Sequence, residues 1–267
     1  MLEIILVINF LGMIILPLIA GFYFSRKFDL SWKIYLAGGL MFIASQALHI
    51  PLVLALTSTF QSWEIPAYAA ILGLLAGIFE ETARYILFKF ILKKSNTWND
   101  SVYVGIGHGG MEAVIFGVLA ALTFVNMLAY RNVDLSTVPG IPPEQIELAK
   151  QQVDAYWSIP PYLAILGFAE RIFAMCLHVS LSVMVLYGLR SANPVWYWFA
   201  VMWHAVVDGL AVYLGQSFDP LVVEGVIAVC AVISIMITMW MKSKFEALNL
   251  SAEDQLGGQG QGRSEAE

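Results

Sequence analysis

Charged residues are scarce in this chain of 267 residues. Asp, Glu, Lys and Arg together make up 13% of it, against about 25% in a typical soluble domain. Hydrophobic residues make up 59%, and the mean hydropathy is +0.74. Acidic residues outnumber basic ones, and the formal net charge is -6. The composition therefore predicts a membrane protein and provides no basic surface for a nucleic-acid partner.

Cysteine is nearly absent, and this excludes two common kinds of small site. Cys176 and Cys230 both lie within apolar runs, so neither a disulfide framework nor a CxxC redox or zinc motif is available. The HExxH motif is missing as well, which excludes a zincin or a site-two-type protease by that motif.

Long apolar runs recur along the chain, and each run of about 20 residues can cross a hydrocarbon core of roughly 30 Å as a helix. In lipid a lone segment satisfies its backbone hydrogen bonds only as a helix. We therefore predict an all-α polytopic transmembrane helical bundle. The first run carries Glu3 and lacks a basic flank, so we interpret it as a retained span and not as a signal peptide. The seven expected spans are about 4–24, 34–57, 66–92, 103–129, 161–188, 195–214 and 220–241.

The cations follow alternate spans, and this pattern predicts the orientation. Lys and Arg follow the first, third, fifth and seventh spans, whereas the other connections hold few of them. Because connections rich in Lys and Arg are cytoplasmic, we expect the N-terminus outside and the C-terminus in the cytoplasm. The expected location is the cell membrane, with several passes.

We expect a single domain over residues 1–250. The long fourth connection, about 130–160, is expected outside the membrane, and its prolines bracket an amphipathic stretch over 144–156 that predicts a short surface helix. Residues 251–267 have too little apolar content to offset the entropy of ordering. We predict a disordered cytoplasmic tail there.

Ionisable residues inside the expected spans are the candidate functional residues, since a charge at mid-bilayer costs at least about 2.5–3.5 kcal/mol. Several pairs at i,i+4 share one helix face. Counted at about 1.5 Å per residue, most of the group lies roughly 12–20 Å from the cytoplasmic ends. This layer comprises Glu80, Glu81, Arg84, His108, Glu112, His178, His204 and Asp208.

Two other positions fall outside the layer. Glu170 and Arg171 are nearer the outer side, so we interpret them as a separate structural pair. His49 lies near the outer end of the second span and looks isolated. Interhelical polar contacts also serve as packing contacts in membranes, and a single Glu–Arg or His–Asp pair has that interpretation as readily as a catalytic one.

A layer of three histidines and four carboxylates has the ligand chemistry of Zn²⁺, and a His and carboxylate set with one open position is typical of hydrolytic sites. Three motifs carry the pattern: Glu80-Glu81-x-x-Arg84, His108-x-x-x-Glu112 and His204-x-x-x-Asp208. Together they resemble the CPBP superfamily of intramembrane proteases, which includes CAAX prenyl proteases, bacteriocin-processing proteins and PrsW-type proteases. The sequence is most similar to the YhfC-type intramembrane metalloproteases, from about the third span to the seventh. CAAX-type members have EExxxR, so the arginine here is turned by about 100° around the helix relative to theirs.

That resemblance implies an intramembrane peptidase acting on a peptide or membrane-protein substrate within membrane lipid. Glu80 would be the general base for water, with Glu81 and Arg84 positioning it. The metal ligands would be histidines, His108, His178 and His204, with Zn²⁺ as the expected cofactor, while Glu112 and Asp208 would support catalysis. A metal-free route, in which Glu80 and His108 activate water and His204 and Asp208 bind the oxyanion, is equally sound chemically.

Two other classes of protein compete with this interpretation. A proton- or cation-coupled transporter also uses buried carboxylates and histidines, although the inverted repeats typical of transporters are not evident in the sequence. A nonenzymatic immunity or scaffold protein would leave Glu80 dispensable. The enzyme interpretation predicts that Glu80, His108 and His204 converge in one polar cavity opening toward the cytoplasmic half.

Overall fold

The computed structural model describes residues 1–60 and 63–264, with side chains described as far as Leu250. The described part contains helices and no strand. Short 3₁₀ turns at Leu135–Thr137 and Pro143–Gln145 precede α5, and a π-helical turn, Leu87–Ile91, follows α3. The α-helices are α1 (Leu2–Phe28), α2 (Trp32–Phe60), α3 (Ile65–Ile86), α4 (Trp98–Tyr130), α5 (Ile146–Trp157), α6 (Leu166–Arg190), α7 (Val195–Ser217) and α8 (Pro220–Ser264).

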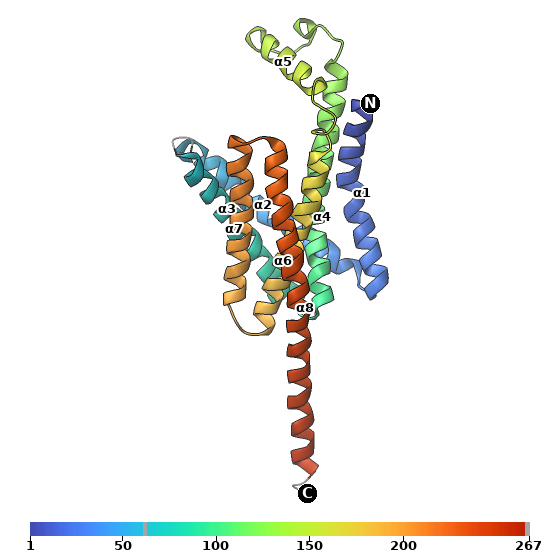
Figure 1. The fold of residues 1–267 in the computed structure, drawn as a ribbon, viewed down its shortest axis with the longest axis vertical. Helices are drawn as coiled ribbons and strands as arrows, with labels where there is room; N and C mark the ends of the chain where they lie inside the picture. Colours follow the sequence, from blue (N-terminus) through green and yellow to red (C-terminus); the bar gives the residue numbers. More distant parts are fainter. Residues whose placement is uncertain (61–62, 265–267) are drawn as a thin grey trace.

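Six helices in the described part are long and apolar enough to cross a membrane, namely α1, α2, α4, α6, α7 and the Pro220–Leu250 part of α8. The predicted all-α membrane bundle is therefore confirmed, and the protein is a multi-pass membrane protein. The third expected span, α3, is not among these six. It has 22 residues and carries Glu80, Glu81 and Arg84, and it lies among the other helices of the bundle (Figure 1). A total of seven spans stays a prediction.

The two ends of the bundle differ. The N-terminus and α5 lie at one end, and α8 runs from that end to the opposite one (Figure 1). The predicted short helix over 144–156 is confirmed as α5, whose side chains are mostly exposed. The expected disordered tail, 251–267, falls on residues whose side chains lie outside the described part, and it stays a prediction.

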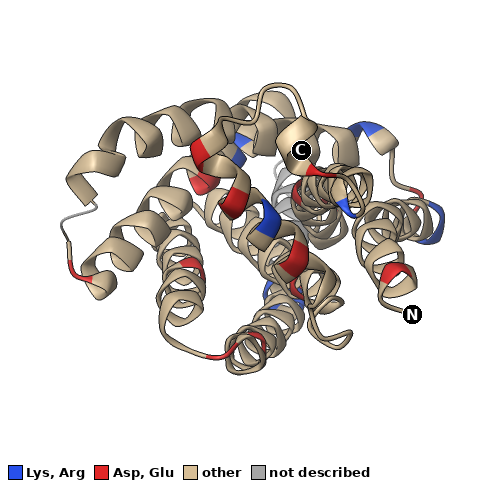
Figure 2. Ribbon diagram, turned by 90° about the horizontal axis from the view of Figure 1, so that it is seen from above, with Lys and Arg blue, Asp and Glu red and all other residues tan. Residues whose placement is uncertain are grey.

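Polar and apolar side chains are distributed as a lipid environment requires. Figure 2, viewed from above, shows most of the ribbon free of Lys, Arg, Asp and Glu. Large hydrophobic side chains such as Leu40, Leu122 and Met236 lie on the outside, whereas Glu81, Arg84 and His108 are fully buried. Because lipid tails are as apolar as leucine, helices pack through close contact and interhelical polar bonds.

Glycines let α3 approach α7 closely enough to bring their polar residues together. Gly73 and Gly77 are spaced as in a GxxxG motif. A Cβ atom at Gly73 would lie 2.2 Å from the carbonyl oxygen of Ala205, and one at Gly77 would lie 2.6 Å from that of Val201. Only residues without a Cβ fit this contact, which is typical of membrane helix pairs. The site residues of α3 follow directly after Gly77.

Candidate active site

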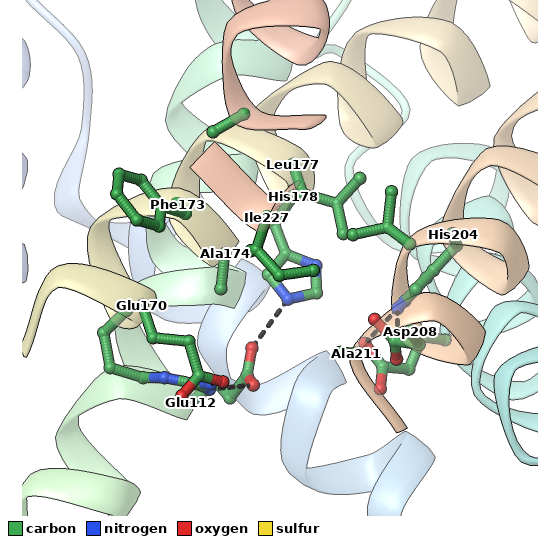
Figure 3. A pocket seen from close by; sticks show the side chains of 14 residues that line it. Glu112, Glu170, Phe173, Ala174, Leu177, His178, His204, Asp208, Ala211 and Ile227 are labelled. Carbon is green, nitrogen blue, oxygen red and sulfur yellow. Dashed lines mark hydrogen bonds and ion pairs between the residues drawn. The ribbon is translucent and has the colours of Figure 1, made fainter. Parts of the chain in front are cut away.

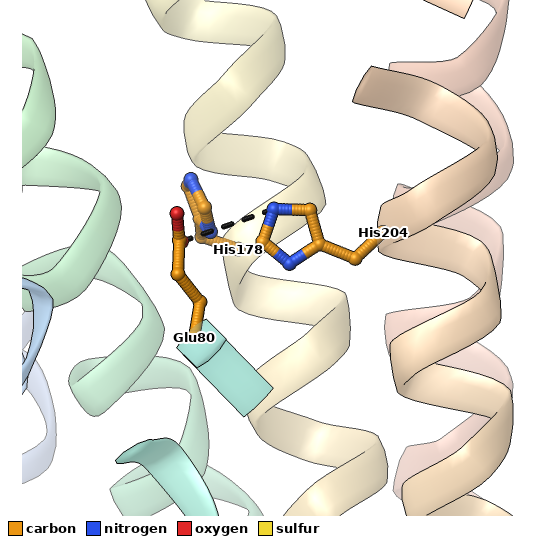
Figure 4. A group of neighbouring side chains, drawn as sticks. All are labelled: Glu80, His178 and His204. Atoms are coloured by element: carbon orange, nitrogen blue, oxygen red, sulfur yellow. Dashed lines mark ion pairs between the residues drawn. The ribbon is translucent and has the colours of Figure 1, made fainter. Parts of the chain in front are cut away.

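Glu80 lies at the centre of the polar cluster, where α2, α3, α4 and α7 meet. Its Oε1 accepts a hydrogen bond of 2.8 Å from Nε2 of Gln46. Its Oε2 lies 3.0 Å from Nε2 of His108 and 3.8 Å from Nε2 of His204. Figure 4 shows Glu80 pointing between His178 and His204, with the ion pair to His204 dashed. A single carboxylate therefore contacts residues of three other helices.

The ring of His204 is held in one orientation by two carboxylates. Nδ1 lies 2.8 Å from Oε1 of Glu81, and Nε2 lies 3.4 Å from Oδ2 of Asp208. Glu81 also accepts a hydrogen bond from Arg84, so it is the acceptor and Nδ1 of His204 carries the proton. Nε2 of the same ring then faces Glu80 and Asp208, on the side of the cluster where a metal ion or water could bind.

Arg84 is completely buried and connects α3 with α6. One of its terminal nitrogens donates to Glu81, and the other lies 3.2 Å from Nδ1 of His178. Because a guanidinium can only donate, Nδ1 of His178 accepts, and its Nε2 carries the proton that is donated to Oε2 of Glu112 over 2.6 Å. Nδ1 is therefore an acceptor in His178 and a donor in His204.

The cluster extends farther toward the start of α6 than the sequence indicated. Arg171 contacts Glu112 at 2.5 Å and also forms an ion pair with Glu170. The interpretation of Glu170 and Arg171 as a separate pair was wrong, because the long Arg171 side chain reaches back from α6 to α4. Glu112 therefore joins His178 to this second group.

A cavity of about 70 Å³ adjoins the cluster, which is room for several water molecules. It is lined by Glu80, His178, His204 and Asp208 and by Glu112, Glu170 and Arg171. Figure 3 shows Glu112 with His178 on one side and Asp208 with His204 on the other. Glu80 and His204 share this cavity, as predicted, but His108 is not part of its lining.

The lining of the cavity extends along the bundle from the cluster, and the predicted opening toward the cytoplasmic half stays a prediction. Beyond the cluster, its lining comes from Glu170 and Arg171 near the start of α6, from Asp208 and Ala211 after His204 on α7, and from Ile227 near the start of α8. These positions lie toward the end of the bundle that holds α5, away from the ends rich in Lys and Arg. The cavity extends this way because the polar residues continue past the cluster in this direction.

The donor types at this site fit a metal ion. Glu80, His178 and His204 each offer a ligand atom, and these atoms lie within 4.8 Å of one another. A set of two histidines and one carboxylate with an open position is a known zinc arrangement. Nε2 of His204 has only the two longer carboxylate contacts, whereas His178 would have to give up its contact with either Arg84 or Glu112. Of the three histidines predicted as ligands, His108 is outside the set and reaches it through Glu80.

Two residues of this network were missed or misinterpreted in the sequence. Gln46 was not singled out, although it contacts Glu80 directly. His49 was interpreted as isolated, but its Nδ1 lies 3.3 Å from Oε1 of Gln46 and its ring stacks on Phe79. The spacing of Gln46 and His49, three residues apart on one helix face, was the available signal.

Fold and site together define a multi-pass α-helical membrane protein with a buried Glu/His/Arg cluster open to a small polar cavity. Residues 12–231 match the family model described as YhfC intramembrane metalloprotease. The chain belongs to this family. It is also 28% identical over 252 residues to "Uncharacterized membrane protein YhfC" of Bacillus subtilis (strain 168), covering 87% of this chain and 93% of the relative. No solved structure matches the chain.

Proposed function

We propose that this protein is an intramembrane peptidase that hydrolyses peptide bonds with water activated at the buried carboxylate of Glu80. One observation carries the proposal. Glu80 lies 3.0 Å from one imidazole and 3.8 Å from another beside a cavity large enough for water. Burying this carboxylate with two imidazoles costs free energy, and apolar residues in their place would usually give equal stability. A function therefore explains the cluster better than packing does.

The neighbours of Glu80 have distinct roles in this proposal. Nε2 of His108 contacts Oε2 of Glu80 from the side of α4 and keeps the carboxylate in place. His204 and Asp208 lie on the cavity side and can hold water or a developing oxyanion. Glu81 and Arg84 form the buried ion pair that holds Nδ1 of His204 as a donor and fixes the orientation of its ring. Glu112 orients His178 in the same way.

The family description implies a metal, and the residues that would hold it are Glu80, His178 and His204. A bound Zn²⁺ would polarise the scissile carbonyl and favour ionisation of water at neutral pH. Glu80 is then committed as a ligand, and Asp208 becomes the proton acceptor. Its side chain is 39% exposed and lies 3.4 Å from Nε2 of His204. In the metal-free arrangement Glu80 itself takes the proton. Glu80 is essential in both arrangements.

The resemblance to the CPBP and PrsW proteases supports a substrate that is a peptide or a membrane protein. The cluster is surrounded by helices whose outer faces are apolar. A substrate that reaches the site from the bilayer would be a membrane-embedded segment, which is surrounded by lipid before it binds. In this proposal the catalytic layer lies within the membrane.

The test is hydrolysis by the purified full-length protein in liposomes, with fluorescently labelled single-span membrane segments and labelled casein as probes. Glu80→Gln keeps the shape of the side chain but removes its ability to take a proton or carry charge. We expect at least one probe to be cleaved and Glu80→Gln to reduce the rate by about 10²–10⁴-fold. The matched control is Glu64→Gln, the same change at an exposed residue preceding α3. Full activity of Glu80→Gln, or proton flux without cleavage of any probe, would overturn the proposal.

A further inference from the structure

Two polar side chains of α2 form a short chain of hydrogen bonds that ends on Glu80. The amide nitrogen of Gln46 donates to Oε1 of Glu80 over 2.8 Å. The amide oxygen of Gln46 therefore faces the other way, and it lies 3.3 Å from Nδ1 of His49. Since an amide oxygen only accepts, Nδ1 of His49 is the donor. Both hydrogen bonds of the chain point toward Glu80.

The ring of His49 is fixed independently of Gln46. It stacks on Phe79 with ring centroids 5.5 Å apart and an interplanar angle of 16°. Phe79 directly precedes Glu80 on α3. The stack therefore ties this part of α2 to the turn of α3 that carries the carboxylate, and it holds Nδ1 of His49 against the amide of Gln46.

The two oxygens of Glu80 have different partners, and Gln46 accounts for this difference. Gln46 contacts Oε1, whereas His108 and His204 contact Oε2. A carboxylate held at only one oxygen can rotate about its terminal bond, because that torsion is broad. With Gln46 in place, Oε2 is the oxygen kept between the two imidazoles.

Gln46 also lies between Glu80 and a second cavity. This cavity, of about 290 Å³, is lined by residues of α2, α3 and α7, and its polar lining is Gln46, His49 and Asp208. Water in this space would compete for Oε1 of Glu80 if the amide of Gln46 were removed. The chain of hydrogen bonds thus both orients the carboxylate and occupies the oxygen that faces away from the imidazoles.

We propose that Gln46, oriented by His49, is a positioning residue that fixes the carboxylate of Glu80 for the reaction. This inference rests on the proposed function, in which Glu80 acts on water directly or as a metal ligand. Outer residues that orient a catalytic group typically account for about 10–100-fold in activity. In this role Gln46 acts through Glu80 and contacts neither the attacking water nor the substrate, so its effect should appear in turnover and not in substrate binding.

The experiment compares Gln46→Met with the wild type in the full-length protein in liposomes, using the probe that the wild type cleaves best. Methionine keeps the length of the side chain and removes the amide donor. We expect kcat to fall by about 10–100-fold with KM changed by less than about twofold. The control is Ala47→Val, at the neighbouring exposed position of α2. An unchanged kcat in a folded Gln46→Met protein would overturn the proposal.

A matched pair of His49 variants tests the second bond. His49→Asn keeps a side-chain N–H near the position of Nδ1, whereas His49→Phe keeps the stack on Phe79 without any N–H. We expect His49→Asn to retain more than half of the wild-type kcat and His49→Phe to lose about 3- to 10-fold, a smaller effect than that of Gln46→Met because His49 acts through it. Equal losses in the two variants would assign the role of His49 to packing and contradict the orienting hydrogen bond.

An infrared readout separates failure of this inference from failure of the proposed function. The carboxyl band of Glu80 is identified as the band lost in Glu80→Gln. Its frequency depends on the hydrogen bonds to both oxygens, so we expect it to shift in Gln46→Met and stay in place in Ala47→Val. If the wild type cleaves no probe, the proposed function fails, and the band alone decides the positioning role. An unshifted band in Gln46→Met would overturn that role.

Discussion

Nδ1 of His204 donates a hydrogen bond of 2.8 Å to Oε1 of Glu81. This contact joins α7 to α3 at the level of the cavity, and it leaves Nε2 of the same ring facing Glu80 and Asp208 at the site. The carboxylate can play this part because the neighbouring Arg84 holds it as an anion inside the bundle. Orientation of His204 therefore depends on a buried ion pair.

The Glu81–Arg84 pair predicts a separation of stability from activity. Glu81→Leu leaves a buried guanidinium without its counter-charge, and Arg84→Leu leaves a buried carboxylate. Each single variant should be less stable by about 3–5 kcal/mol. The double variant Glu81→Leu/Arg84→Leu removes both charges, so it should recover most of the stability. It should remain inactive, because Nδ1 of His204 has lost the acceptor that fixes the orientation of the ring.

Thermal unfolding in detergent and the hydrolysis assay in liposomes measure the two properties. Recovery of both stability and activity in the double variant would contradict the orienting role of Glu81. The exposed ion pair between Glu3 and Arg131 supplies the control. Breaking it with Glu3→Leu should cost at most about 1 kcal/mol, because such pairs are screened by solvent.

Metal content distinguishes the two arrangements of the site. We expect the protein purified without chelator to contain zinc at close to one ion per chain. His204→Ala and Glu80→Gln should lose it, because each removes a ligand of the three. Asp208→Asn should keep the ion and lose turnover by about 10²–10⁴-fold, since it removes the proton acceptor alone. Elemental analysis beside the activity assay is the measurement. A metal-free protein that is active in the presence of chelator would make Glu80 the proton acceptor.

Close packing of α3 on α7 predicts a strong effect of the smallest substitution. In Gly73→Ala the added Cβ would lie 2.2 Å from the carbonyl oxygen of Ala205, so the helices must separate. We expect a loss of about 1–3 kcal/mol in stability, and a loss of activity because Glu81 and His204 are moved apart. Gly215→Ala on α7 is the control, because its Cβ would meet nothing within 4 Å. Equal thermal stability of the two variants would contradict this packing account.

The orientation of the chain can be tested directly. Lys and Arg lie in the last turns of α1 and α6 and just after the π-helical turn that follows α3, and connections rich in these residues remain in the cytoplasm. A reporter fused after Leu250 should therefore be active only if it is a type that works in the cytoplasm. A reporter placed at Gly140, in the connection before α5, should behave in the opposite way. Activity of an extracytoplasmic reporter after Leu250 would reverse the predicted orientation.

Some members of the cluster could be found from the sequence, and others could not. Glu80, Glu81, Arg84, His178 and His204 stand out because ionisable residues are rare in apolar runs, and their similar depth predicted that they could meet. Gln46 carries no charge and therefore gave no such signal. His49 was misjudged because its partners, Gln46 and Phe79, become neighbours only when α2 packs on α3.

The sequence by itself determined that this is an α-helical membrane protein and which helices carry ionisable groups, because length, apolar content and spacing along one helix are local properties. Only the tertiary structure decided which atoms meet. The donor at Oε1 of Glu80, the different partners of Nδ1 in His178 and His204, and the lining of the cavity depend on helix rotation and on close contact at glycines such as Gly73. A rotation of one residue, about 100°, turns a side chain from the site to the lipid, and no local pattern encodes that angle.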